Sequence, residues 1–239
     1  MNNRFIKTLM VAVLIPGTAI AGESGFLDDY SILGAPGEFG EARMYVAEGA
    51  PERMANYDRI MIDQPWIFID PESKSKGMKP DTMTAIAETL RSAVSDAISE
   101  SYEVVEEKGE GVIYFRWAVT NLYLQKPKRK LRSFTPVGAV AHAAKSGLSD
   151  FVDKNTLVDL RLEAELFDSV TGEVFIAMVI DRGQRKDKAA KIDEDSASWD
   201  ELFAIGTSLG QRWVCRVNNA RIDESERVDC TKIAIGTSN

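Results

Sequence analysis

The stretch VDLRLEAEL, residues 158–166, decides how this chain folds. The residues at every second position are apolar: Val158, Leu160, Leu162, Ala164 and Leu166. Charged residues occupy the positions between them. Because successive side chains of a β-strand point to opposite faces, the pattern predicts a strand with one buried face and one solvent-exposed face. Such strands are typical of antiparallel sheets.

The residues on either side of this strand predict a larger sheet. Residues 168–172 (DSVTG) have the composition of a turn, so residues 173–180 are expected to return as the hairpin partner. Three more strands are predicted upstream: 59–70, 102–106 and 111–124. Within the first of them, Pro65 indicates a bulge or a sheet edge.

Two regions instead show the three- and four-residue spacing of amphipathic helices. They run from Met83 to Ile98 and from Leu202 to Val217. A third helix, of small apolar residues, is predicted at 136–152, packed on its own sheet or, alternatively, forming an oligomer interface. The predicted fold class is therefore α+β: an antiparallel or mixed β-sheet with two long amphipathic helices packed on one face plus a small-residue helix.

The amino end has the pattern of a signal peptide. Arg4 and Lys7 precede a seven-residue apolar core at 9–15, and the small residues 19–21 (AIA) predict cleavage after Ala21. We therefore expect a signal peptide at 1–21, an extended amino-terminal segment at 22–56 with at most one short strand at 43–47, and a single α+β domain at 57–239.

Charge and hydropathy exclude two classes of partner. No apolar run approaches the roughly 20 residues that a membrane-spanning helix needs. Without residues 1–21 the chain has 27 basic and 37 acidic side chains, a net charge of -10. Because this field repels polyanions, we expect no nucleic-acid partner. The expected location is the periplasm, without a transmembrane span.

The two cysteines agree with export. Cys215 and Cys230 are the only ones in the chain. In an oxidising compartment an isolated pair most often forms one structural disulfide. The alternative, a redox-active pair, is disfavoured because the Cys-x-x-Cys spacing of thiol–disulfide enzymes is absent. We expect a structural disulfide.

Residues 24–33 (SGFLDDYSIL) resemble the opening of a bacterial family of exported proteins and lipoproteins known as domain-of-unknown-function family 3313. Three other places are also similar to that family: Tyr57-Asp58, the turn at 168–173 and the helix that begins at Trp199. The resemblance implies an envelope protein of unassigned activity, with no catalytic residues to carry over. Many relatives resemble lipoproteins with a leader cysteine, which this chain lacks. The strand–helix–strand–strand order is also similar, at the level of fold, to the amino-terminal domain of TolB and to the curli secretion-channel lipoprotein.

Several catalytic devices find little support. His142 is the only histidine, so a Ser-His-Asp triad or a catalytic zinc site would depend on it alone. Ser73 and Lys76 match a Ser-x-x-Lys motif, but in a polar loop without the companion motifs, so a solvated loop is preferred. Acidic pairs such as Asp28-Asp29, or the run 193–195, are expected by chance in so acidic a chain. We predict no metal and no cofactor.

Two basic clusters stand out against this acidic background. The first is the candidate binding patch, and it contains Lys128, Arg129, Lys130 and Arg132. The second contains Arg182, Arg185, Lys186, Lys188 and Lys191. Such runs most often form solvated loops. The sharper hypothesis is a docking patch for an envelope protein or an anionic lipid headgroup.

These observations favour a non-catalytic periplasmic or cell-envelope module for binding or assembly. Two alternatives stay open: a periplasmic hydrolase with carboxylates that the sequence does not identify, and a subunit of an envelope ring.

Overall fold

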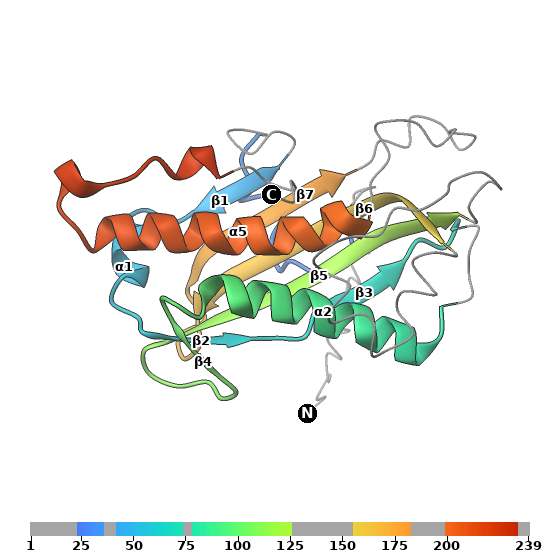
Figure 1. Ribbon diagram of the computed structural model, residues 1–239, viewed down its shortest axis with the longest axis horizontal. Helices are drawn as coiled ribbons and strands as arrows, with labels where there is room; N and C mark the ends of the chain where they lie inside the picture. The colour runs from blue at the N-terminus through green and yellow to red at the C-terminus, as the bar shows by residue number, and fades with distance from the viewer. Residues whose placement is uncertain (1–22, 36–41, 74–77, 126–154, 183–198, 234–239) are drawn as a thin grey trace, which may run out of the picture.

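The computed structural model describes residues 23–35, 42–73, 78–125, 155–182 and 199–233. In these ranges the strands form one mixed sheet of seven strands. Both long helices lie side by side in front of the sheet, over the same face (Figure 1). We call this the helix face and the opposite side the back face. The α+β fold class predicted from the sequence is confirmed.

Three long antiparallel strands form the centre of the sheet. They are β5 (Val112–Gln125), β6 (Thr156–Asp168) and β7 (Val174–Arg182), with β6 in the middle. The predicted hairpin between β6 and β7 is confirmed. Its turn contains Gly172 at a φ of 74°, a conformation that glycine adopts without steric cost.

Shorter strands flank this centre. On one side β1 (Arg43–Val46) pairs antiparallel with β7. On the other side β2 (Arg59–Ile62) and β3 (Trp66–Ile69) pair, both in parallel, with successive parts of β5. The strand β4 (Glu103–Val105) pairs in parallel with the outer edge of β2.

The prediction of one continuous strand at 59–70 is wrong, because a break at Asp63 divides this stretch into β2 and β3. The indole N–H of Trp117 donates to the backbone carbonyl of Asp63 at 2.9 Å, and the hydroxyl of Tyr114 bonds to its carboxylate. Pro65 follows, and it has no N–H to continue the ladder. The N–H of Asp63 still donates to the carbonyl of Phe115 at 3.0 Å, but its carbonyl is taken by the Trp117 side chain and the ladder stops there.

The helices bury the stripes that their periodicity predicts. In α2 (Pro80–Ile98) the buried residues include Ile86, Leu90 and Ile98. The second long helix, α5 (Trp199–Ala220), approaches α2 closely at Gly210, where a Cβ atom would lie 3.0 Å from the Cβ of Ala97. Glycine allows this close approach, because a Cβ atom at this position would be tighter against Ala97 than packed side chains normally are.

A short helix, α1 (Ala50–Met54), lies within the segment that the sequence predicts to be extended apart from one strand. Gly49 precedes it at a φ of 64°, and Ala50 and Met54 are fully buried. The strand expected at 43–47 is present as β1. Five residues give too short a periodic pattern to be recognised in the sequence.

One expectation about β6 is wrong. Its charged face is not solvent-exposed: Glu163 is 0% exposed and Glu165 is 3% exposed. Residues 24–33 cross the back face and cover these side chains, as described below. The predicted signal peptide at 1–21 and the small-residue helix at 136–152 lie outside the described residues.

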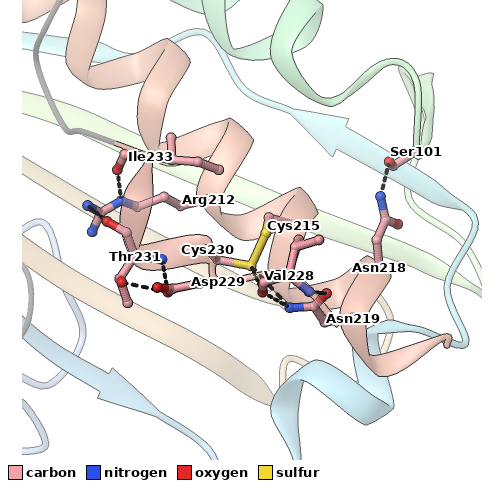
Figure 2. The surroundings of a disulfide bond; sticks show 10 residues. All are labelled: Ser101, Arg212, Cys215, Asn218, Asn219, Val228, Asp229, Cys230, Thr231 and Ile233. Carbon is pink, nitrogen blue, oxygen red and sulfur yellow. Dashed lines mark hydrogen bonds between the residues drawn. A yellow bond between two sulfur atoms is a disulfide. The ribbon is translucent and has the colours of Figure 1, made fainter. Parts of the chain in front are cut away.

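The carboxyl-terminal tail runs back along α5. Cys215 and Cys230 form the expected disulfide, with a Cα–Cα distance of 5.8 Å. Figure 2 shows the hydrogen bonds around it, in which Arg212 donates to the carbonyls of Thr231, at 3.0 Å, and Ile233. The tail contains two 3₁₀ turns, η1 (Glu224–Glu226) and η2 (Cys230–Lys232). These contacts hold the tail against the helix.

Replacing both Cys215 and Cys230 by Ser should lower the free energy of unfolding by about 3 kcal/mol, since an open loop of this length gains that much chain entropy when the protein unfolds. Urea unfolding followed by circular dichroism measures the loss. Reduction of the wild-type protein should give the same midpoint as the double variant. Equal midpoints for the oxidised protein and the variant would contradict the prediction.

The turn between β6 and β7 depends on the carboxylate of Asp168. It accepts hydrogen bonds from the hydroxyl of Tyr57 at 2.6 Å and from the backbone N–H groups of Val170 at 2.9 Å and Thr171 at 2.6 Å. Burial opposes ionisation, but these hydrogen bonds outweigh it and hold the pKa of Asp168 below the ordinary value of 3.8.

Because the folded-state pKa of Asp168 is lowered, its contribution to stability is present above about pH 4 and is lost as the pH falls through the folded value. Asp168→Asn should therefore cost about 1–2 kcal/mol at neutral pH, and the difference from wild type should shrink in acid. Urea unfolding at a series of pH values measures this. The matched control, Asp223→Asn in the exposed tail, removes a carboxylate that caps no backbone group and should change stability little at neutral pH.

Candidate functional site

The back face of the sheet is crossed by residues 24–33, which we call the strap. Phe26, Leu27 and Tyr30 of the strap are buried and pack on Ala118 of β5 and Val179 of β7. These apolar side chains lie among the charged side chains that β5 and β6 place on the back face. The strap follows this surface and separates the centre of the back face from water.

A buried hydrogen-bond network fastens the strap to β6. The hydroxyl of Tyr30 donates to the carboxylate of Glu163, which also accepts from the hydroxyl of Thr120 at 2.7 Å. The backbone N–H groups of Phe26 and Leu27 donate to the same Tyr30 oxygen, at 3.1 and 3.3 Å. Burial raises the pKa of Tyr30, and the adjacent Glu163 raises it further. Tyr30 is therefore held as a neutral donor.

A second, ionic contact lies beside it. The guanidinium of Arg116 donates to Glu165 at 2.6 Å and lies 3.0 Å from the carboxylate of Asp28 in the strap. It also lies over the ring of Phe26, 5.2 Å from the ring centre. Burial raises the pKa of Glu165, and Arg116 partly offsets that effect. Arg116 thus joins the strap to both β5 and β6.

Near its amino end the strap meets two exposed aromatic side chains, Trp66 and Phe68. Together with the buried Phe26 of the strap they form a group that we call the aromatic edge. The rings of Phe26 and Trp66 meet edge to face at 5.9 Å, and those of Trp66 and Phe68 lie 6.0 Å apart. Trp66 is 60% exposed and Phe68 46% exposed. Both side chains belong to β3. Among the described residues, β3 pairs with β5 and with no other strand. Large apolar side chains on an unpaired sheet edge are characteristic of interaction surfaces.

The back-face carboxylates are bonded to other groups of the protein. Glu163 and Glu165 are covered by the strap and occupied by Tyr30, Thr120 and Arg116. Among the described residues no group of three or more His, Cys, Asp or Glu side chains is suited to hold a metal ion. In the same part of the chain no helix is long and apolar enough to cross a membrane.

Most of the residues that the sequence singled out lie outside the described ranges. This holds for the candidate patch of Lys128, Arg129, Lys130 and Arg132, for His142, for the acidic run 193–195 and for the second basic cluster apart from Arg182, which is half-buried at the end of β7.

Three of the singled-out residues have structural roles. Ser73 is not in a solvated loop as expected: it is buried, and its hydroxyl donates to the carbonyl of Leu124 at 3.1 Å. Asp28 pairs with Arg116, and Asp29 accepts from the backbone N–H of Ser31 at 2.8 Å.

The sequence analysis did not identify Tyr30, Glu163 and Glu165 as residues that hold the strap on the sheet. The signal available was the apolar side chains Phe26, Leu27 and Tyr30 within 24–33, which need a surface to pack on, together with the charged positions of β6. Nothing in the spacing shows that these two segments, more than 130 residues apart for Tyr30 and Glu163, meet.

Comparison with known proteins gives one clear match. The model of the family described as "Protein of unknown function (DUF3313)" matches residues 22–204. No curated protein matches the chain.

Solved structures resemble this one only distantly. Two of them are structures of the PelC dodecamer from Paraburkholderia phytofirmans, one of a point variant and one in a second crystal form. Their sequences are 12% and 13% identical to this one, and both give a TM-score of 0.33. Each match covers 74% of this chain and 95% of the PelC chain. A neuraminyllactose-binding hemagglutinin homolog from Helicobacter pylori is 10% identical, with a TM-score of 0.30 and coverage of 53% and 63%.

Tyr30→Phe should lower the free energy of unfolding by about 2 kcal/mol, because it leaves the buried Glu163 carboxylate with one donor fewer. Glu163→Gln alone should cost a similar amount, and the two losses should not add in the double variant. Urea unfolding of the four proteins measures the coupling. Tyr45→Phe, at a half-buried tyrosine of β1, is the matched control and should change stability little. Additive losses would show that the hydrogen bond does not hold the strap.

Proposed function

The chain belongs to the DUF3313 family of proteins of unknown function, and on that premise we propose that it is a non-catalytic binding module of the cell envelope. In this proposal the aromatic edge recognises an extended segment of a partner protein, which adds to β3 as a further strand. The observation that carries it is the exposure of Trp66 and Phe68 on an edge strand.

The geometry of β3 supports this mode of recognition. Its side chains alternate between exposed, at Trp66 and Phe68, and half-buried, at Ile67 and Ile69. A peptide paired with such an edge gains main-chain hydrogen bonds, and aromatic side chains at alternate positions select its side chains. Folded proteins normally protect edge strands with charges, so an uncharged aromatic edge favours recognition.

The aromatic edge is also preorganised. Phe26 belongs to the strap, and its ring packs edge to face against that of Trp66. The guanidinium of Arg116 lies over the ring of Phe26. A rigid surface loses little conformational entropy when a partner binds. The strap therefore has a function beyond covering the sheet, because it holds one of the three aromatic rings in place.

The envelope location rests on two observations. A disulfide joins Cys215 and Cys230, as is usual in oxidising compartments, and residues 1–21 have the pattern of a signal peptide. The basic cluster at 126–132 remains a hypothesis for contact with an anionic lipid headgroup or an acidic envelope protein.

A periplasmic hydrolase is the competing class. It would require converging carboxylates that reach a substrate, whereas Glu163 and Glu165 are buried beneath the strap and are bonded to protein groups. The ring hypothesis predicts a large oligomer, so light scattering after size-exclusion chromatography of the mature chain tests it separately.

Photo-crosslinking in intact cells tests the proposal, with a photoreactive amino acid at position 66 or 68 and a matched control at Val170, which is 65% exposed on the far turn. We expect a partner protein to be crosslinked from β3 positions only. With that partner purified, Trp66→Ala plus Phe68→Ala should weaken binding by about 2 kcal/mol or more, roughly thirtyfold, as truncation of central aromatic anchors does.

The double variant Val170→Ala plus Val228→Ala removes two equally exposed apolar side chains elsewhere and should bind normally. The proposal is wrong if crosslinks from β3 reach only a second copy of this chain, or if the aromatic variants bind the purified partner as wild type does.

A further inference from the structure

The strap is attached to the sheet through side chains rather than through backbone pairing. No backbone–backbone hydrogen bond among the described residues joins residues 24–33 to a strand of the sheet. The bond from the N–H of Gly34 to the carbonyl of Met44 in β1, at 2.9 Å, comes just beyond the strap. The residues of a paired strand are held by ladder hydrogen bonds, whereas the strap depends on a few side chains for its position.

Few of these side chains are buried. Phe26, Leu27 and Tyr30 are the buried residues of the strap. With Ala118 and Val179 they form a cluster that is separate from the large core beneath the helices. The exposed residues of the strap are Ser24, Gly25, Asp28, Asp29, Ser31 and Ile32. A segment with few buried apolar side chains opens at a lower free energy than the core does.

The surface beneath the strap is one that water can solvate. Under Tyr30 lie the carboxylate of Glu163 and the hydroxyl of Thr120. Beside them the guanidinium of Arg116 lies 3.0 Å from the carboxylate of Asp28. Carboxylate, hydroxyl and guanidinium groups all form hydrogen bonds with water, so detachment of the strap leaves none of them without a partner. The strap therefore separates from the sheet without exposing a large apolar layer.

Phe26 connects the strap to the aromatic edge. Its ring meets that of Trp66 edge to face, with the ring centres 5.9 Å apart. The guanidinium of Arg116, which pairs with Asp28 of the strap, lies over the same Phe26 ring. When the strap detaches, Trp66 loses this neighbour, and a partner then has to order an indole that is 60% exposed. The form with the strap in place is therefore the better binding surface.

We propose that the strap detaches from the back face and returns to it as one unit while the rest of the protein stays folded, and that the partner segment binds the form with the strap attached. The coupling rests on the proposed function, because it regulates the affinity of that same edge. The fraction of molecules with an attached strap then sets the apparent dissociation constant. By linkage, partner binding holds the strap in place by the same factor. Tyr30 is accordingly a positioning residue, which acts on the partner through Phe26.

Amide hydrogen exchange in the full mature chain, without a partner, tests the detachment. The backbone N–H groups of Phe26 and Leu27 donate to the hydroxyl of Tyr30, so their exchange reports on the attached strap. Their protection should be roughly a hundredfold lower than that of the Leu162 amide in the centre of β6. Low urea should accelerate them little, because detachment exposes little surface, but should accelerate Leu162 steeply. Equal protection and equal urea dependence would overturn the detachment.

A series of strap variants tests the coupling with the purified partner. Leu27→Ala, Tyr30→Phe and their combination weaken the attachment without changing a residue of the aromatic edge. The dissociation constant should rise in inverse proportion to the attached fraction, so a variant with one strap in ten attached should bind about tenfold more weakly. The exchange of the Phe26 amide gives that fraction. Ile32→Ala, at an exposed apolar residue of the same strap, is the matched control and should bind normally.

Val94→Ala separates this regulation from a general loss of stability. Val94 is buried in α2, on the opposite face from the strap. The variant should lower the melting temperature, because it leaves a cavity in the core, and should leave both the strap exchange and the affinity for the partner unchanged.

The results distinguish this coupling from the proposed function. Saturating partner should slow exchange at Phe26 and Leu27 at least about tenfold. The coupling is overturned, while recognition by β3 stands, if that exchange is unchanged or if variants with a detached strap bind as wild type does. If Trp66→Ala plus Phe68→Ala binds the partner normally, the proposed function fails and the coupling fails with it, whereas the exchange measurement on the free protein is unaffected.

Discussion

The burial of one carboxylate, that of Glu163, is the constraint on which the back half of the molecule depends. Glu163 lies in the central strand β6 and is 0% exposed. A buried carboxylate needs hydrogen-bond donors, and Thr120 of the neighbouring strand supplies only one of them. The other is the hydroxyl of Tyr30, so residues 24–33 have to cross the back face. The position of Phe26 beside Trp66, and of Asp28 beside Arg116, follows from that crossing.

The helix face is organised by a different requirement, the close approach of its two helices. Gly210 lets α5 lie against Ala97 and Ile98 of α2. This close contact draws α5 toward α2, while the strands on the far side, β7 and β1, are left with less cover. The disulfide then holds the tail against the exposed side of α5, where Arg212 is fixed by two carbonyls. Packing on one side of α5 and a covalent link on the other therefore fix the position of this helix.

The aromatic edge is the part of the sheet on which the proposed recognition depends. Among the described residues β3 pairs with β5 alone, so Trp66 and Phe68 lie next to strand backbone of the kind that an extended polypeptide pairs with. The same strand, β5, carries Thr120 and Arg116, which connect to the strap through Glu163 and Asp28. The aromatic edge and the strap are therefore supported by the same centre of the sheet.

The sequence by itself determined the α+β class, the β6–β7 hairpin, the stripes of α2 and α5 and the pairing of the two cysteines. Each of these depends on residues close together in the chain or, for the cysteines, on there being only two. Tertiary structure alone decided that the charged face of β6 is buried and that Asp63 splits β2 from β3. Alternation shows which residues share a face, but whether water or another segment covers that face depends on contacts between distant parts of the chain. Such contacts leave no periodic pattern in the sequence.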